Sequence, residues 1–316
     1  MKKYIGKRLL TAIPVLLMIT IGAFIMINLA PGEPTDLYVT PDATQAQIEA
    51  TRRALGLDQS YPIQYVRWLG RALVGDLGVS FSTRYPVLPI IISRLGPTIV
   101  LMGATLLFSY IVAIPLGIIS ARKQGTWIDT FLTAGAFVGV SIPNFFLGLG
   151  LIYIFAVRLD WFPTGGMIEL GREGGILKVM HHLVLPVIVL SAFYIANMTR
   201  YMRSTMIQVY GENYIRTATA KGLAQRVILT KHGIRNALIP VITIIGTDLP
   251  RLVGGAIVTE QIFQWPGLGR LTITAIQQRD LPILMAITIL SAIVVLLANV
   301  LVDVMYAVVD PRIKYD

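Results

Sequence analysis

Residues 95–121 read LGPTIVLMGATLLFSYIVAIPLGIISA and contain no acidic or basic side chain. A helix needs about 20 apolar residues to cross a bilayer core of roughly 30 Å, so this stretch is long enough for one span. Four other uncharged stretches are of similar length, namely residues 9–32, 130–157, 179–199 and 281–302. A further apolar segment, residues 235–260, is interrupted by Asp248 and Arg251. The sequence therefore predicts an all-α integral membrane protein with about six transmembrane helices.

The composition supports the same class. Of the 316 residues 55% are hydrophobic and 14% are charged, and the mean hydropathy is +0.69, so most of the apolar surface must face lipid. The net charge of +10 does not indicate nucleic-acid binding, because the basic residues lie between hydrophobic runs. The absence of cysteine excludes disulfides, thiolate metal sites and a cysteine nucleophile.

The basic residues predict the orientation, because Lys and Arg accumulate in cytoplasmic loops. Residues 33–94 hold six basic and six acidic residues, and residues 158–178 hold three of each, so both segments are assigned to the outside. Three other segments are strongly basic and are assigned to the cytoplasm, together with both termini. Their basic residues are Lys2, Lys3, Lys7 and Arg8, then Arg122 and Lys123, then Arg200, Arg203, Arg216, Lys221, Arg226, Lys231 and Arg235.

Four parts of the chain follow from these spans. Residues 1–32 form the cytoplasmic N-terminus and a first helix that is retained, since no signal-peptidase site follows it. Residues 33–94 form a small extracytoplasmic insertion with two expected short helices, 45–55 and 64–74. Residues 95–308 form a five-helix core with a cytoplasmic loop at 201–236, and residues 309–316 form a cytoplasmic tail.

Tyr65, Trp68 and Leu69 share one face of the second short helix. We expect this face to pack on the ends of the spans, with a position at the lipid interface as the alternative.

The sequence gives no sign of catalysis by this chain alone. It lacks the phosphate-binding G-x-x-x-x-G-K-[ST] loop and the H-E-x-x-H metal motif. His181 and His182 are adjacent, so on a helix they point about 100° apart and do not form a metal-binding face. We therefore expect no catalytic residue, no metal site and no cofactor within the chain.

The most informative segment is the cytoplasmic stretch 211–240, GENYIRTATAKGLAQRVILTKHGIRNALIP. Good helix formers occupy 212–221, Gly222 permits a turn, and a helical pattern resumes at 224–235 before Pro240. A short helix across the cytoplasmic face could dock into another protein. From charge alone, an ordinary basic loop that faces anionic lipid headgroups is the favoured interpretation.

This segment resembles the E-A-A-x3-G signature of permease subunits in bacterial binding-protein-dependent ABC importers. Arg216-Thr217-Ala218 stands where Glu-Ala-Ala is usual, Gly222 matches the glycine, and Pro240 closes the segment. The leading acid is absent and Pro240 lies 18 residues after Gly222 instead of 13. Both departures are similar to the peptide and nickel branch, as are TATAKGL (217–223) and RNALIP (235–240).

Further short motifs resemble the same branch along almost the whole chain, and the outer insertion is similar to that of the first of the two permeases in dipeptide and oligopeptide systems. The motifs are LAPGEP (29–34), LGLD (55–58), YVRWL (65–69), GDLG (75–78), SIPNF (141–145), WPGLGR (265–270) and DPRI (310–313).

The resemblance implies a type I ABC importer transmembrane domain that takes up di- or oligopeptides. It implies four partners, namely a second homologous permease, two cytoplasmic ATPases that bind the ATP and magnesium, and an extracytoplasmic peptide-binding protein. The localisation is then the bacterial cytoplasmic membrane. Residues 212–235 would form the coupling helix, with ATPase contacts at Arg216, Thr217, Ala218, Lys221, Gly222 and Leu223.

A second candidate site lies within the spans. Asp248 and Arg251 fall at membrane depth, where charges usually face the protein interior. They either line the pore or pair with each other at a helix break near Pro250, with Gly254-Gly255 continuing into a re-entrant turn. Asn144, next to Pro143, is expected to mark an unwound or gating part of the third span.

Three alternatives to the peptide permease remain at this stage. A nickel or metal-chelate permease of the same family would share these motifs. An ion-gradient-driven secondary carrier would show inverted repeats and matching helix interruptions, and only one strong interruption is present. A membrane-anchored structural or receptor subunit would not need the helix–glycine–helix segment.

Overall fold

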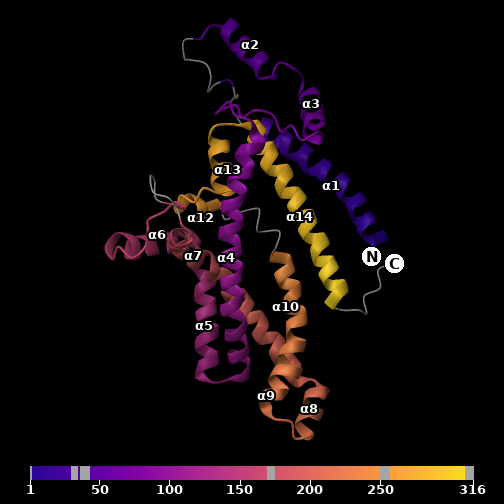
Figure 1. Cartoon of the computed structure of the whole chain (residues 1–316), viewed down its shortest axis with the longest axis vertical. Helices are drawn as coiled ribbons and strands as arrows, with labels where there is room; N and C mark the ends of the chain where they lie inside the picture. Colours follow the sequence, from indigo (N-terminus) through magenta and orange to yellow (C-terminus); the bar gives the residue numbers. More distant parts are fainter. Residues whose placement is uncertain (1, 30–34, 36–42, 169–174, 249–256, 310–316) are drawn as a thin grey trace.

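The computed structural model describes residues 2–29, 35, 43–168, 175–248 and 257–309. In these ranges the protein is helical and has no strand (Figure 1). Five helices are long and apolar enough to cross a membrane, and a bent pair makes six if it counts as one span, as the sequence predicts. In chain order the elements are α1 (Lys2–Leu29), α2 (Gln45–Ala54), α3 (Tyr61–Leu73), α4 (Val87–Arg122), α5 (Trp127–Ser141), α6 (Asn144–Leu151), the π-helical η2 (Ile152–Arg158), α7 (Ile176–Gly211), α8 (Asn213–Ala220), α9 (Gln225–Val227), the π-helical η3 (Ile228–Ile234), α10 (Arg235–Asp248), α12 (Ile257–Ile262), α13 (Leu268–Gln277) and α14 (Leu281–Val309).

The core of the molecule is the packing of α4 against α7, the two longest helices. At Gly117 the backbones approach so closely that a Cβ atom would lie 2.8 Å from the carbonyl oxygen of Thr199 and 2.6 Å from the Cβ of Met202. In a membrane no hydrophobic force draws helices together, so their association depends on close packing. A small residue at the contact permits this packing and the dispersion energy that comes with it. Met202 and Met206 of α7 are fully buried in the hydrophobic cluster between these two helices.

The third span is bent. Its first half, α5, ends at Ser141, and α6 begins at Asn144 after a bend of 97°. Pro143 has no backbone N–H and disfavours helical geometry in Ile142, which adopts an extended conformation with ψ of 121°. At about 1.5 Å per residue, α5 is shorter than a bilayer core is thick. Asn144, which is expected to mark an unwound or gating part of this span, is the first residue of α6, so the break lies directly before it.

Several helices extend beyond their expected limits. The second span begins at Val87 rather than at residue 95, and α7 continues to Gly211, which takes in the first part of the loop expected at 201–236. The fifth span runs to Asp248 as a helix. Arg251, and the break and turn expected near Pro250 and Gly254-Gly255, lie outside the described residues.

The insertion forms the two expected helices, α2 and α3. Thr44 and Gln47 make a capping box at the start of α2. Tyr65 of α3 packs edge to face on Phe24 of α1, at 5.6 Å between ring centroids, and its hydroxyl lies 2.9 Å from that of Thr20. This confirms that the Tyr65 face packs on a span.

Asp280 ties the end of the insertion to the start of α14. This fully buried carboxylate accepts hydrogen bonds from the Ser80 hydroxyl (2.6 Å), the Ser82 hydroxyl (2.8 Å) and the Ser82 backbone N–H (3.0 Å). Buried carboxylates are retained at low cost only when such donors surround them. The loop that follows α3 is therefore held on the same end of the molecule as α13 and the start of α14 (Figure 1).

Candidate coupling and translocation sites

The helix α8 is the structural form of the expected coupling segment. It is short, covering Asn213–Ala220 rather than all of residues 212–235, and it lies with α9 at one end of the molecule (Figure 1). The chain then continues through η3 directly into α10. A change in the position of α8 is therefore carried by short connections to two spans, α7 and α10.

One side of α8 is buried and the other is exposed. Ile215 and Ala218 pack into the cluster formed by α7, η3 and α10, so Ala218 is not available to another protein. The other five predicted contact residues are exposed, namely Arg216, Thr217, Lys221, Gly222 and Leu223.

Gly222 has a conformational role. Its φ is +72°, and Gly222 N–H and Leu223 N–H donate to the carbonyl oxygens of Thr219 (3.0 Å) and Ala218 (3.3 Å). This is a Schellman cap, in which the residue after the C-cap must be left-handed. A Cβ at Gly222 would meet nothing within 4 Å in the described structure, so the cap, and not close packing within the chain, accounts for the glycine.

Tyr214 anchors the start of α8 to α10 through a hydrogen bond with the side chain of Asn236. Burial and the nearby Glu212 raise the pKa of this phenol, so it stays neutral. The Asn236 amide donates in turn to the carbonyl oxygen of His232, at 2.7 Å.

A buried ion pair joins the helices that lead to α8. Arg203 of α7 binds Asp129 of α5 with two parallel hydrogen bonds, Nε to Oδ1 at 2.6 Å and Nη2 to Oδ2 at 2.7 Å. The Ser120 hydroxyl and the Gly125 N–H also donate to this carboxylate, at 2.5 Å and 3.0 Å. The sequence analysis assigned Arg203 only a topological role, and nothing in a single sequence pairs it with Asp129.

The predicted pore residues do not form one cluster. Asp248 is 6% exposed and accepts a hydrogen bond from the Tyr110 hydroxyl of α4, at 2.8 Å. Asn144 is half-buried at the start of α6, which Figure 1 places on the opposite side of α4 from α10. The pairing of Asp248 with Arg251 lies outside the described residues. Tyr110 is a partner that the sequence analysis missed, because an uncharged residue in a span gives no signal.

Glu260 is a second residue that the sequence analysis did not use. It is fully buried on α12 and accepts hydrogen bonds from the Thr98 hydroxyl (2.9 Å), the Arg270 N–H (3.0 Å) and the Gly269 N–H. Thr98 also accepts from the Leu268 N–H, at 2.8 Å. The carboxylate thus fixes the short helices α12 and α13 on α4. Burial raises the pKa of this carboxyl group, because desolvation disfavours its charged form.

Replacing Glu260 by Gln is expected to destabilise the protein by about 1–3 kcal/mol. The side-chain NH2 group of Gln would point at an N–H or O–H donor from which the carboxylate oxygen now accepts a hydrogen bond. When the pKa of a carboxyl group is higher in the folded than in the unfolded state, the protein loses stability as the pH rises from the unfolded-state pKa through the folded-state pKa. The variant should lack this pH dependence. Thermal unfolding of the detergent-solubilised chain at several pH values measures both effects, with the exposed Glu49→Gln as control. Equal unfolding temperatures for Glu260→Gln and the parent would contradict the role of Glu260.

Two of the three histidines contact backbone carbonyl oxygens in the structure. His181 Nε2 lies 2.8 Å from the carbonyl oxygen of Trp161, and His182 Nδ1 lies 3.1 Å from that of Gly165. No group of metal-ligating side chains occurs among the described residues. These contacts fix the segment after η2 on α7.

Comparison with known proteins identifies the family to which the chain belongs. Residues 113–315 match the family described as the binding-protein-dependent transport system inner membrane component, and residues 1–102 match its N-terminal family. The chain belongs to this permease family. It is thus a transport subunit of the ABC importer class, integral to the membrane, and not an enzyme.

The relatives of this permease cover its full length. It is 45% identical over 316 residues to the oligopeptide transport system permease protein AppB of Bacillus subtilis, covering all of both chains. It is 38% identical over 315 residues to the glutathione transport system permease protein GsiC of Escherichia coli K12, again with full coverage of both.

Among solved structures, the permease resembles a chain of the inward-facing MetNI methionine ABC transporter. The TM-score is 0.57 at 16% identity, over 71% of this chain and 97% of the other. This similarity shows the fold, that of a type I importer transmembrane domain.

Proposed function

We propose that this permease takes up di- and oligopeptides that an extracytoplasmic binding protein delivers, and that it forms half of the translocation pathway. The observation that carries the cargo assignment is the full-length similarity, at 45% identity, to an oligopeptide permease. The secondary carrier and the structural subunit are set aside, since the family match covers almost the whole chain.

The proposed complex contains a second, homologous permease and two cytoplasmic ATPases. These ATPases would bind ATP and magnesium, so this chain holds no cofactor of its own. The excess of Lys and Arg around α8 and before α1 supports a cytoplasmic position for both termini and for α8. α2 and α3 then lie outside the cell.

We propose that α8 is the coupling helix. Arg216, Thr217, Lys221, Gly222 and Leu223 face away from the permease core and would enter a groove on one ATPase. Ala218 and Ile215 would transmit the movement, since they are packed against α7, η3 and α10.

The proposed translocation pathway includes Asp248 and Arg251 near the middle of the chain's path through the membrane, and the bend at Asn144 as a gate. The burial of Asp248 and its bond to Tyr110 are typical of a charge that faces the interior of a bundle. A peptide carries a charged amino group and a charged carboxylate, for which these two side chains are chemically suitable partners.

Uptake assays test the cargo. In cells that lack the chromosomal copy, the parent gene should restore uptake of labelled di- and tripeptides, and Asp248→Ala combined with Arg251→Ala should lower it with normal complex assembly. Uptake of nickel without peptide uptake would replace the peptide assignment by the metal-chelate one. Unchanged peptide uptake by the double variant would remove the pore role.

A further inference from the structure

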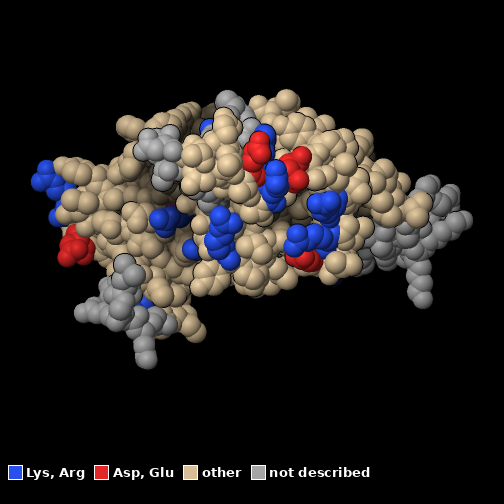
Figure 2. Space-filling model, turned by 90° about the horizontal axis from the view of Figure 1, so that it is seen from above, with Lys and Arg blue, Asp and Glu red and all other residues tan. Residues whose placement is uncertain are grey.

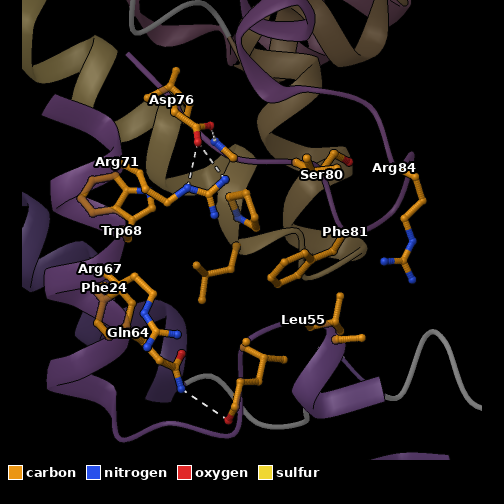
Figure 3. A pocket seen from close by; sticks show the side chains of 18 of the residues that line it. Phe24, Leu55, Gln64, Arg67, Trp68, Arg71, Asp76, Ser80, Phe81 and Arg84 are labelled. Atoms are coloured by element: carbon orange, nitrogen blue, oxygen red, sulfur yellow. Dashed lines mark hydrogen bonds and ion pairs between the residues drawn. The ribbon is translucent and has the colours of Figure 1, made fainter. Parts of the chain in front are cut away.

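The extracytoplasmic end of the protein contains a pocket of about 400 Å³ between α3, the end of α2, the loop after α3 and the start of α14. Its apolar walls include Phe24, Trp68 and Phe81, and Leu281 lies at its floor. The clasp of Asp280 with Ser80 and Ser82 holds Phe81 in place. Figure 3 shows Gln64 and Arg67 reaching from α3 towards the space in front of Phe81 and Leu55.

Arginines outnumber acidic residues in the lining of the pocket. Four arginines line it with one acidic residue, Asp76, which is paired with Arg71 at 2.8 Å, and Arg53 pairs with Glu49 at 3.5 Å. The residues of the insertion balance in charge overall, so this clustering is local. Lys and Arg are normally enriched on the cytoplasmic side of a membrane. The rule that sets membrane topology therefore does not explain these arginines on the outer side. Figure 2, which views this end of the molecule from above, shows basic side chains gathered near the centre of the face.

One arginine of the pocket is available to a ligand. Arg67 is exposed, and its guanidinium makes no hydrogen bond or ion pair with any described residue. The Nε1 of Trp68 also has no partner in the described part of the chain, but this atom is buried and is not reached from the pocket. A ligand with anionic oxygens supplies acceptors to the Arg67 guanidinium.

Another face of α3 is an apolar stripe that no described residue covers. Ile63, Val66, Leu73 and Val74 recur at helical spacing and are 46%, 66%, 79% and 81% exposed. Arg67 and Arg71 lie on α3 between this stripe and the side that packs on α1. A helix with an exposed apolar stripe flanked by arginines is typical of one that lies in the headgroup layer of a bilayer.

The pocket also lies beside the outer ends of two candidate spans. Phe24 lies in the outer half of the α1 span Leu10–Leu29, and Leu281 begins the α14 span, so both helices contribute to the pocket near their outer ends. The adjoining surface of α1 is apolar and exposed, with Met26 69% and Leu29 77% exposed. Acyl chains therefore have a continuous apolar surface leading from the pocket.

We propose that this pocket binds the phosphate headgroup of an anionic phospholipid of the outer leaflet. Arg67 donates to the phosphate oxygens, Arg71 and Arg84 contribute positive charge, and the acyl chains run along α1 and the stripe of α3. The bound lipid fixes the insertion on the membrane surface. The inference concerns this site alone and does not depend on the cargo.

Fluorescence quenching tests the proposal. The full chain, with Trp127→Phe and Trp161→Phe, retains Trp68 and the fully buried Trp265. In phosphatidylcholine nanodiscs, phosphatidylglycerol brominated on its acyl chains should quench Trp68 more strongly than brominated phosphatidylcholine at equal mole fraction. Arg67→Ala should weaken the apparent phosphatidylglycerol affinity roughly fivefold, the effect of one basic residue at an anionic surface. Arg52→Ala, which removes the same charge from α2 outside the pocket, should leave it unchanged.

Three results would overturn the proposal. Equal quenching by both brominated lipids shows that the headgroup is not recognised, and equal losses in Arg67→Ala and Arg52→Ala show a diffuse charge effect. Displacement of the brominated lipid by inorganic phosphate shows a site for a soluble anion. If lipid preference survives Arg67→Ala while the affinity of the peptide-binding protein falls, the arginines serve protein docking instead.

Discussion

Reversing two charges on α8, by Arg216→Glu with Lys221→Glu, is expected to abolish ATP-driven uptake and to leave the permease folded. Both side chains are exposed and make no hydrogen bond or ion pair with any described residue, so the change costs the permease itself little. A groove that receives this basic surface must be complementary to it, and reversal places like charges together. Residues central to an interface contribute about 2 kcal/mol or more, which corresponds to a roughly 30-fold weaker affinity for the ATPase.

Co-purification with the ATPases and peptide uptake both measure this effect. Arg52→Glu with Lys178→Glu, at two exposed positions away from α8 and outside the pocket, makes the same change in charge and should retain both activities. A thermal unfolding temperature equal to that of the parent shows that the variant is folded. If the α8 variant still bound both ATPases and transported peptide normally, α8 would not be the coupling helix.

The membrane spans could be predicted from sequence because the bilayer imposes a minimum length of apolar helix. Their ends could not, since a helix such as α4 continues to Val87 past Arg94 once it leaves the hydrocarbon layer. The bend at Pro143 also has a local cause, and the Pro-Asn pair indicated an unwound or gating position there without predicting a bend. Its angle depends on what α6 and η2 pack against.

The proposed coupling site rests on resemblance, and the structure separates its buried residues from its exposed ones. Ile215 and Ala218 are three residues apart, at the spacing of one helix face, while the residues between them are polar. This pattern could have indicated that Ala218 faces inward. By contrast, Asp129 with Arg203, Asp280 with Ser80, and Asp248 with Tyr110 join residues far apart in the chain, and a single sequence gives no means of pairing them.

Removing the carboxylate of Asp129 is expected to be the most destabilising single change described here. Asp129→Ala leaves Arg203 without its anion, and the Ser120 hydroxyl and Gly125 N–H without their acceptor. Loss of one partner of a buried ion pair costs about 3–5 kcal/mol, because the remaining charge stays buried. The side chain of Arg203 is 28% exposed, so we expect a loss of about 3 kcal/mol.

A double-mutant cycle separates the pair from its surroundings. Unfolding of Asp129→Ala, Arg203→Ala and the combined variant, followed in detergent, should give single losses whose sum exceeds that of the combined variant. The exposed Asp58→Ala is the matched control and should change stability little. Additive losses would show that the two side chains act independently.

The same pair should affect coupling. Arg203 lies on the part of α7 that leads into α8, and Asp129 fixes that part to the turn between α4 and α5. If this connection is lost, α8 can move with the ATPase without moving α7 as a rigid unit. We therefore expect a combined variant such as Asp129→Leu with Arg203→Met, which restores apolar packing, to recover stability but to hydrolyse ATP with less peptide transported per ATP. Recovery of both properties would show that the ion pair only stabilises the fold, whereas recovery of stability alone would show that it transmits movement.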